Sequence, residues 1–465
     1  MRDPGSDDEG EAVILHADSV DSRSEAGPVV SRRDLRGIKL RVWQSQSAWS
    51  AATNYSIAFS ALLGGIAVAR SLGPIGRGQL AAAVVWSVAL SSLATLGLPA
   101  SLAYHVAKYP SHARQYLRMS LVAGVGAGVA CAAFDFVFLT FVLAHRQHIS
   151  TGVAASFSLW VFLLTVAIYP IAYLQGTSQF SRWNVCRAMT NAGPGIAMIL
   201  LWLLNILSIQ SVAFCYVVAS LATIAVGFFF VALLHSGRSA SSLGAEIPEK
   251  EVISNRSFWL YGVRNFPSVM MATANSRVDQ FILTVVASPA QLGIYVVASS
   301  PSALLVPLVN GFSSVHLISI AMMDDVQQAT LLAHRMLRRG ATIAFCSSAV
   351  VAILLPFAIP LVFGQKFQAS IAPAEILVWG GCFFAIDLVL AAALLGLGRP
   401  GIIGIGEGVG AAITAAGVLL TYRHGLVLVG AAASVGFAST SVIGSVALLS
   451  SKFVPRLQRH ETQCG

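Results

Sequence analysis

The chain has 465 residues, of which 56% are hydrophobic and only 11% are charged. Soluble domains carry about 25% charged residues, so the composition excludes a water-soluble enzyme. The net charge of +9 does not indicate nucleic-acid binding, because the basic residues gather at the ends of apolar segments, where they set topology and meet anionic lipid head groups.

The first 30 residues differ from the rest of the chain. They hold eight Asp and Glu among Gly, Ser and Pro, a composition typical of a disordered tail. They lack the basic start and apolar core of a signal peptide. At Ser31 the sequence changes to a basic juxtamembrane stretch, 31–41. We expect this stretch either to lie on the inner leaflet or to serve only as a topology anchor.

Twelve apolar segments follow, each about as long as the roughly 20 residues that a helix needs to cross a bilayer. In chain order they occupy 48–69, 79–103, 119–144, 152–174, 188–207, 210–234, 259–286, 291–319, 341–363, 371–395, 402–420 and 426–450. The sequence therefore predicts an all-α polytopic membrane protein.

The charges between these segments orient the chain. Twenty Lys and Arg lie in the even-numbered connections, the basic stretch 31–41 and the carboxy-terminal flank. The odd-numbered connections hold only five, namely Arg70, Arg77, Arg146, Lys366 and Arg423. Because short loops rich in Lys and Arg stay in the cytoplasm, we expect a multi-pass protein of the inner (plasma) membrane with both termini cytoplasmic.

The connections also predict two related halves. The longest lies after the sixth segment and is polar, so we expect six-helix lobes at 46–235 and 258–451, a cytoplasmic linker at 236–257, and flanking segments at 1–45 and 452–465. Gly78 and Gly293 lie 215 residues apart, and each opens a long apolar segment. Gly176 and Gly396, 220 residues apart, are a second matched pair. Halves with an even number of spans face the same way, as in parallel transporter repeats, and a substrate cavity is expected between them.

Several motifs resemble those of the polysaccharide-biosynthesis flippases, a family of the multidrug/oligosaccharidyl-lipid/polysaccharide exporter (MOP) superfamily. They are spread over about 55–450: Arg70–Gly78 (RSLGPIGRG), Leu96–Ala100 (LGLPA), Arg277–Leu283 (RVDQFIL), Gln291–Ala298 (QLGIYVVA), Phe363–Ser370 (FGQKFQAS), Gly396–Pro400 (GLGRP) and Val429–Ser434 (VGAAAS).

The resemblance implies a MATE-like fold, with two pseudo-symmetric six-helix lobes around a cavity that opens alternately to each side. It implies a flippase rather than an enzyme, acting on undecaprenyl-pyrophosphate-linked oligosaccharides for exopolysaccharide, O-antigen or capsule assembly. Polysaccharide polymerases and glycosyltransferases are the partners it implies. Many relatives carry fourteen transmembrane helices, whereas twelve are expected here. A flippase for peptidoglycan precursors with fourteen helices therefore fits this chain less well.

Two alternatives stay open. One is a cation-coupled exporter of drugs or metabolites from the same superfamily, although those proteins usually carry an acid in their first helix and segment 48–69 has Asn54 but no acid. The other is a membrane enzyme such as a glycan ligase or acyltransferase, although no long external loop or His–Asp cluster is present. No cofactor and no metal site is expected.

Charged residues inside the membrane are costly and face protein or water, and segment 259–286 concentrates them. At 100° per residue, five of its residues form one polar stripe: Arg264, Ser268, Met271, Asn275 and Asp279. Arg277 lies roughly opposite. A span with such a stripe is expected to line the cavity.

A lipid-linked sugar carries a pyrophosphate, and the planar fork of arginine binds phosphate oxygens in pairs. We therefore expect Arg264 to bind the phosphate first and Arg277 to bind it at a second position deeper in the membrane. Three amides, Asn54, Asn275 and Asn310, are candidates to bond sugar hydroxyls. In the alternative interpretation, Arg277 and Asp279 only close the lobe interface by pairing with Asp387 or other helices.

Three further acids, Asp135, Asp387 and Glu407, are candidates to bind a coupling proton or cation. The alternative is that each is a buried acid satisfied by Ser, Thr or Arg. His105 and His316 lie near segment ends, where interfacial exposure is expected.

Overall fold

The computed structural model describes residues 32–238, 255–307, 325–397 and 399–450, with isolated residues between 308 and 324. The chain divides into a unit that ends at Ser45 and a second that begins at Gln46. In the first unit the described part is the start of a helix at Arg32. The tails predicted at 1–30 and 452–465 and most of the linker predicted at 236–257 lie outside the described residues.

The described residues form helices and turns, with no strand. The first eight helices are α1 (Arg32–Ala94), α2 (Leu98–Lys108), α3 (Ala113–Val137), α4 (Ala144–Gln147), α5 (Thr151–Gly176), α6 (Phe180–Asn191), α7 (Gly193–Leu203) and α8 (Ile209–Arg238). The remaining ones are α9 (Asn255–Val286), α10 (Pro289–Ala303), α12 (Val326–Phe363), α13 (Ile371–Gly396), α14 (Pro400–Thr421) and α15 (Leu426–Ser450).

Within the described ranges, nine helices are long and apolar enough to cross a membrane. Helices are expected there because hydrocarbon offers no partner for backbone N–H and C=O groups, which must bond to one another. Local signals set the starts. Ser150 accepts a hydrogen bond from Val153 N at 3.4 Å at the start of α5, and Ser288 forms a capping box with Gln291 at the start of α10.

The structure differs from the predicted segments mainly near the amino-terminal end of the second unit. The connection expected at 70–78 is a kink inside α1, where Gly73 has a φ of 65° and Pro74 follows. Segment 79–103 is split, because Leu96 and Gly97 adopt positive φ values of 52° and 70° and end the helical path before α2. Segment 188–207 contains the end of the more polar α6 and then the eleven-residue α7, in place of one long span.

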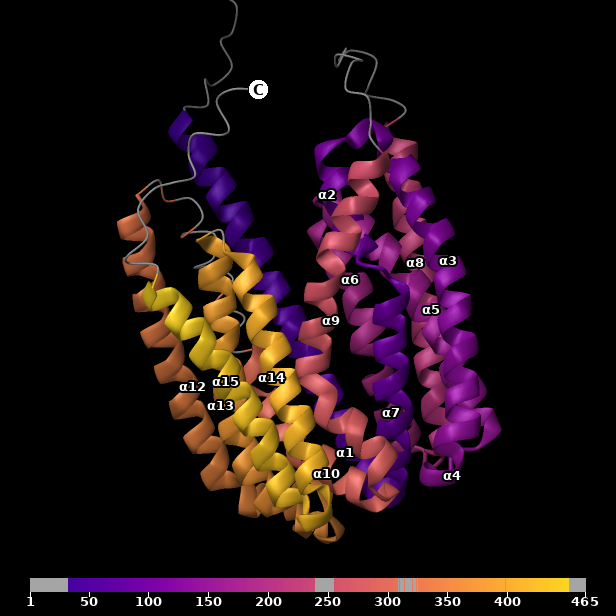
Figure 1. The fold of residues 1–465 in the computed structure, drawn as a ribbon. Helices are drawn as coiled ribbons and strands as arrows, with labels where there is room; N and C mark the ends of the chain where they lie inside the picture. Colours follow the sequence, from indigo (N-terminus) through magenta and orange to yellow (C-terminus); the bar gives the residue numbers. More distant parts are fainter. Residues whose placement is uncertain are drawn as a thin grey trace, which may run out of the picture. The chain divides into compact units, whose positions relative to one another are not determined.

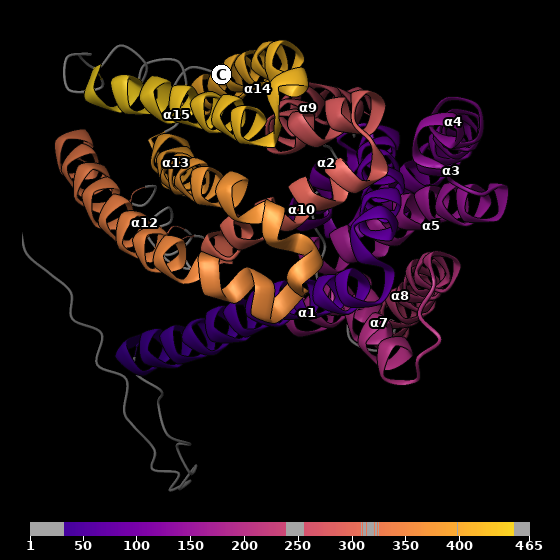
Figure 2. The same cartoon turned by 90° about the horizontal axis from the view of Figure 1, so that it is seen from below.

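The helices of the second unit pack as two groups (Figures 1 and 2). In the amino-terminal group, α5 contacts α2, α3, α6 and α8, and α7 contacts α6 and α8. Residues of α1 join it through hydrogen bonds from Ser60 Oγ to Ala192 O at 2.6 Å and from Ser87 Oγ to Asp135 at 3.1 Å. In the carboxy-terminal group, α13 contacts α10, α12, α14 and α15. Helix α9 contacts both groups, through α2 and α14.

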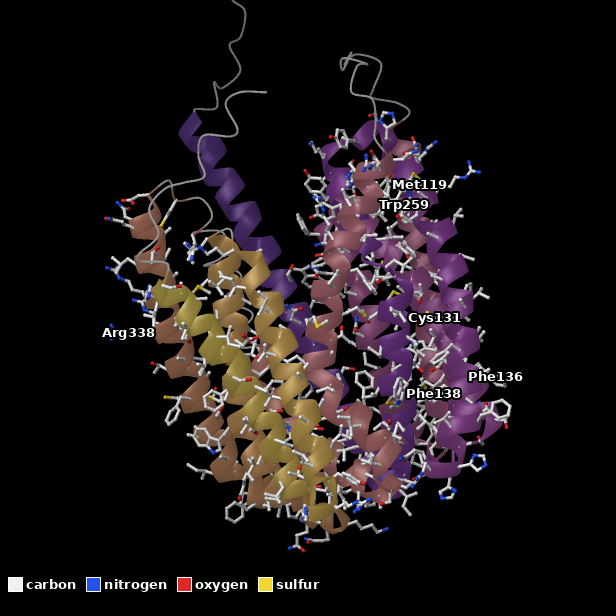
Figure 3. All side chains as sticks on the ribbon, viewed as in Figure 1. Met119, Cys131, Phe136, Phe138, Trp259 and Arg338 are labelled. Carbon is white, nitrogen blue, oxygen red and sulfur yellow. The ribbon has the colours of Figure 1, made fainter. Side chains whose placement is uncertain are left out.

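Large apolar side chains cover the outside of the groups. Phe134 and Val137 of α3, and Phe141 just after it, are each more than half exposed, whereas Phe136 and Phe138 pack against the core. Figure 3 labels Phe136 and Phe138 at this end of α3. The ring of Phe138 lies 4.4 Å from that of Trp86 on α1. A surface in contact with lipid chains must be apolar, with the backbone groups bonded to one another inside helices.

The two ends of the helix groups can be named by their connections. The linker end is where α8 finishes at Arg238 and α9 begins at Asn255. The turn end is where α9 finishes at Val286 and Pro289 opens α10. The charge pattern predicts that the linker end faces the cytoplasm.

Candidate functional site

A cavity of about 910 Å³ lies between the two helix groups. Its wall comes from α1 and α6 on one side and from α10, α13, α14 and α15 on the other, with α9 between them. Pockets for sizeable ligands have volumes of roughly 300–1,000 Å³. The cavity is therefore large enough for part of a substrate head group.

Two arginines from different helices meet in this cavity. Arg77 lies on α1 just past the kink, and Arg277 lies on α9. The two guanidinium groups are close enough to repel one another electrostatically. The Nε atom of Arg77 is buried and has no hydrogen-bond partner among the described residues, and Arg277 Nη1 donates to Gln280 Oε1 at 3.2 Å. A buried donor beside a like charge is a place where an anion would be stabilised.

A third arginine enters the cavity from α6. Arg187 Nη2 donates to Asn54 Oδ1 at 2.8 Å, and its guanidinium lies 4.3 Å from the centre of the Trp183 ring. Asn184 is held in turn by donating to Ser50 Oγ at 2.9 Å. These contacts fix the arginine side chain, so little conformational entropy is lost if it binds a ligand.

The acid in the cavity wall, Asp279, already accepts hydrogen bonds from within the protein. Asp279 Oδ2 accepts a hydrogen bond from the Tyr295 hydroxyl at 2.6 Å, and its Oδ1 accepts one from Gln280 N at 2.8 Å. Its side chain is 6% exposed. Three arginines therefore face one acid, and the described wall carries a net positive charge.

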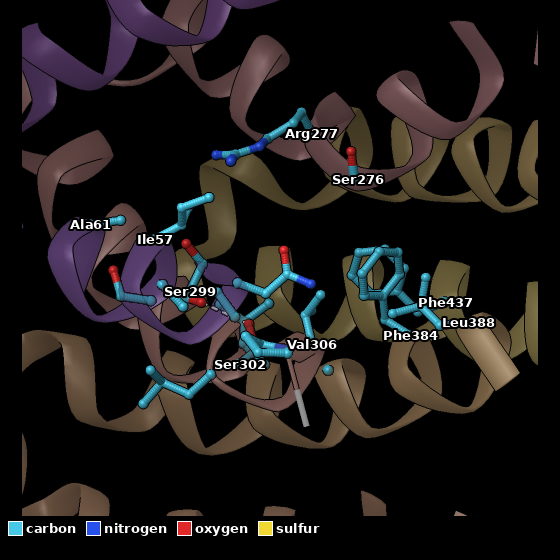
Figure 4. A pocket seen from close by; sticks show the side chains of 18 of the residues that line it. Ile57, Ala61, Ser276, Arg277, Ser299, Ser302, Val306, Phe384, Leu388 and Phe437 are labelled. Atoms are coloured by element: carbon cyan, nitrogen blue, oxygen red, sulfur yellow. Dashed lines mark hydrogen bonds between the residues drawn. The ribbon is translucent and has the colours of Figure 1, made fainter. Parts of the chain in front are cut away.

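The rest of the wall is polar on one side and apolar on another. Figure 4 shows Arg277 opposite Ser299 and Ser302 of α10, with Phe384 and Phe437 at one side. The rings of Phe384 and Phe437 lie 5.2 Å apart. A wall of this kind combines hydrogen-bonding groups with flat apolar surface, as expected for a ligand that is itself amphipathic.

A second polar cluster lies among α9, α13 and α14. Asn275 Nδ2 donates to Glu407 Oε2 at 2.5 Å. The carboxyl groups of Glu407 and Asp387 are within hydrogen-bonding reach of each other, and all three side chains are buried. Two buried carboxyl groups this close repel each other when both are ionised.

The acid of the amino-terminal group lies in different surroundings. Asp135 Oδ2 accepts hydrogen bonds from Ser87 at 3.1 Å and Ser158 at 3.2 Å. Asp135 is completely buried and does not line the cavity. The serine partners agree with the structural alternative for this residue.

The cavity is closed at the turn end by contacts between the two groups. A Cβ atom on Gly78 would collide with the carbonyl oxygen of Pro289, and one on Gly293 would collide with that of Pro74. The glycines matched in the two halves of the sequence thus face each other in space. Gln147 Nε2 bridges the same seam, donating to Thr284 O at 2.7 Å and to Ala287 O at 3.1 Å.

Arg70 supplies a further contact between the groups. Its Nε donates to Val362 O at 2.8 Å, and its Nη2 donates to Leu361 O. These are carbonyls of the last turn of α12, which lack partners inside the helix. We call Gly78, Gly293, Gln147 and Arg70, with their partners, the turn-end seam.

The structure brings together some of the residues predicted for the site. Arg277, Asp279 and Asn54 line the cavity, whereas Asn275 bonds to Glu407. Arg264 is exposed and is not among the described residues of the wall. Ser268 lies in α9, but its side chain and the whole of Asn310 are outside the described residues. The role of each in binding stays a prediction.

Sequence reasoning missed two cavity residues, Arg77 and Arg187. The sequence predicts connections at both positions, because the stretch around Arg77 has the composition of a loop and α6 is too polar to resemble a span. The spacing of Asn184 and Arg187, which places them on one helical face, was the signal that α6 presents polar groups to a common interior.

The expected exposure of His105 is wrong. This residue of α2 is 2% exposed, because its ring packs against Tyr116 of α3 and Phe258 of α9 and its Nδ1 bonds to Ser101 O at 2.9 Å. His316 lies outside the described residues.

Comparison with solved structures places this fold among membrane transporters. One similar structure is an inward-facing multidrug-resistance MATE transporter of the MOP superfamily, with a TM-score of 0.66 and 12% identity over 87% of this chain and 100% of that chain. An outward-facing MATE transporter has a TM-score of 0.61 and 13% identity over 88% of this chain and 95% of the other. A MOP superfamily transporter from Pyrococcus furiosus, described as having a binding pocket of reversed polarity, has a TM-score of 0.62 and 14% identity over the same shares.

The apolar helices define a multi-pass membrane protein, and its fold resembles that of MATE transporters of the MOP superfamily. The sequence profile of the polysaccharide biosynthesis protein family matches residues 45–318, so the chain belongs to that family. A sequence comparison with curated proteins gives no match.

Proposed function

We propose that this protein is a flippase that moves undecaprenyl-pyrophosphate-linked oligosaccharides across the cytoplasmic membrane by alternating access. The observation that carries the proposal is the cavity between the helix groups, where Arg77, Arg187 and Arg277 converge and the acid is already engaged. The glycan serves exopolysaccharide, O-antigen or capsule assembly. Family membership supports a substrate on the route to a polysaccharide.

The chemistry of the cavity fits the head group of such a lipid. A pyrophosphate cannot cross hydrocarbon without compensation, and arginine forks bond phosphate oxygens in pairs. The serines of α10 and the amide nitrogen of Asn54 are available for sugar hydroxyls, while the amide oxygen accepts from Arg187. In this scheme Arg264, nearer the linker end of α9, receives the phosphate first and Arg277 holds it deeper. Asn275 and Asn310 remain proposed sugar contacts.

The proposed architecture has twelve spans in two six-helix lobes, 46–235 and 258–451. This number results when α1 is counted as two spans about the kink at Gly73 and when α7 and α9 are added to the other long apolar helices. The linker end is proposed to face the cytoplasm, where glycosyltransferases assemble the substrate. A polymerase on the other side would take the product.

An exporter of cationic drugs is less compatible with this cavity. Three arginines would repel a cation, and Asp279 is occupied by Tyr295 and the Gln280 amide. Like-charge placement of this kind selects against the wrong ligand.

Depletion of the protein tests the proposal directly. We expect lipid-linked oligosaccharide to accumulate facing the cytoplasm and one surface glycan to disappear, because flipping separates synthesis from polymerisation. Extraction of the lipid intermediates, with protection from an externally added glycosidase, measures this. An unchanged lipid pool together with increased drug sensitivity would contradict the proposal and favour the exporter.

The buried carboxyl pair is proposed to couple transport to a proton. Glu407→Gln keeps an oxygen that Asn275 can donate to but removes one of the two titratable groups of the pair. We expect transport driven by a pH gradient in proteoliposomes to fall at least tenfold, while transport driven by a membrane potential alone continues. That potential favours outward movement of an anion by about 2.3 kcal/mol per charge per 100 mV.

Asp135→Asn is the matched comparison, since Asp135 is also a buried acid and is bonded to two serines. If this variant loses the response to a pH gradient and Glu407→Gln retains it, the coupling site belongs to the amino-terminal group instead.

A further inference from the structure

Helix α12 exposes one continuous face along its length. Among the nine described candidate spans it has the lowest buried share, 17%. Ile353, Phe357 and Leu361 are each more than 70% exposed. Exposed apolar side chains at this density mark a surface that lipid chains cover.

Three arginines continue this face toward the linker end. Arg335, Arg338 and Arg339 are exposed and, with Thr342, surround one surface hollow. At 100° per residue, Arg335, Thr342 and Ile353 point within about 20° of one another, and Arg339 shares the direction of Phe357. The basic residues therefore lie directly above the apolar stripe rather than on another side of the helix.

The guanidinium groups have no use within the described part of the chain. None of the three has a hydrogen-bond or ion-pair partner among the residues that the structure describes. Thr342 Oγ1 donates to Arg338 O at 2.9 Å, which holds this hydroxyl beside the cluster. Figure 3 shows Arg338 on the outside of α12.

The spacing along α12 matches the thickness of a membrane. Arg339 and Leu361 are 22 residues apart, which corresponds to about 33 Å of helix. The hydrocarbon core of a bilayer is about 30 Å thick. When Leu361 lies at one boundary of the hydrocarbon, the arginines lie at the other, at the level of the phosphate groups.

We propose that Arg335, Arg338, Arg339 and Thr342 form a binding site for the head group of an anionic phospholipid, whose acyl chains lie along the Phe345–Leu361 face of α12. We call these four residues the α12 basic site. The site is separate from the central cavity and does not depend on the substrate proposed for that cavity.

The apolar face decides between a lipid and a soluble phosphate. A free phosphate would use only the arginines, whereas a phospholipid also covers the exposed side chains below them. Two arginines one turn apart can each bond the phosphate oxygens, and each basic residue near an anionic surface strengthens binding about fivefold.

Native mass spectrometry of the full-length protein in detergent tests the site, with dioleoylphosphatidylglycerol and dioleoylphosphatidylcholine added in parallel. We expect selective retention of the anionic lipid. Arg338→Gln/Arg339→Gln should lower its affinity about 25-fold, since two contributions of about fivefold are lost. Arg338→Lys/Arg339→Lys should retain an intermediate affinity, because the charge stays and the paired bonds are lost.

The charge-matched control is Arg146→Gln/Arg423→Gln, which removes two exposed arginines elsewhere. We expect it to leave retention of the anionic lipid unchanged, and thermal melting confirms that each variant is folded. Equal losses in both double variants, or no loss in the first, would overturn the proposal. Displacement of the lipid by millimolar inorganic phosphate would assign the site to soluble phosphate and overturn the lipid assignment. If the arginines bind a peptide of residues 1–30 and the protein does not retain the anionic lipid, the arginines would be assigned to that acidic segment. This outcome would also overturn the lipid assignment.

Discussion

Replacing Arg77 and Arg277 together by glutamine is expected to lower transport of the lipid-linked oligosaccharide about a hundredfold or more. Hydrogen bonds to charged groups contribute about 1.5–3 kcal/mol each, which corresponds to roughly ten- to 150-fold for a single arginine. The two guanidinium groups face one cavity from α1 and α9, so a pyrophosphate between them uses both. Flipping of a purified lipid-linked oligosaccharide in proteoliposomes measures the effect.

Two comparison variants separate binding from folding. Arg118→Gln removes an exposed arginine of α3 that does not line the cavity, and we expect normal transport. Arg277→Lys keeps the charge without the planar fork and is expected to lie between wild type and Arg277→Gln. If the double glutamine variant is present in the membrane at wild-type level and transports normally, the cavity arginines do not bind the substrate.

Alanine at Gly78 or Gly293 is expected to force open the turn-end seam. A Cβ atom at either position would collide with a carbonyl oxygen of the opposite helix group. Overpacking of this kind costs about 1–3 kcal/mol, and this cost falls only on the conformation in which the seam is closed. The population with the cavity open at the turn end should therefore rise about five- to 150-fold.

Labelling of a cysteine introduced at Ser299, in the cavity wall, reports this shift. A membrane-impermeant maleimide added from the turn-end side should react at least fivefold faster in Gly78→Ala and in Gly293→Ala. Gly126→Ala is the control, because a Cβ atom there meets nothing within 4 Å. Identical labelling in Gly78→Ala and Gly126→Ala would show that the seam does not limit access to the cavity.

The sequence allowed most helices to be located but not where they bend. Segments such as 152–174 and 426–450 correspond closely to α5 and α15, because a long apolar run in lipid has helix as its only option. At the kink around Gly73 the sequence predicts a loop, since Arg70, Arg77 and several glycines are also typical of loops. Whether a Gly–Pro pair ends a helix or only bends it depends on tertiary packing, here the close contact between α1 and α10.

Some residues of the candidate site can be predicted from the free-energy cost of placing a charge inside a membrane span, and others cannot. Arg277 and Asp279 attracted notice because charges inside a span are expensive, and both line the cavity. Arg187 did not, because α6 resembles a polar connection and only its packing beside α1 turns Arg187 toward Asn54. The engagement of Asp279 by Tyr295, sixteen residues later on the next helix, depends on how α9 and α10 cross and has no signal in the spacing of the residues.

Helix α9 is attached to both helix groups, and this has a mechanical consequence. Near the linker end, Phe258 O accepts a hydrogen bond from Ser101 Oγ at 2.7 Å, and the Tyr261 ring stacks on Tyr104 at 4.9 Å. Farther along, Asn275 is tied to Glu407. Pro267 lies between these attachments and has no amide hydrogen for the carbonyl of Val263. When the two helix groups move relative to each other, α9 must bend because it is attached to both. Pro267 is the position where the helix bends with the fewest backbone hydrogen bonds to break.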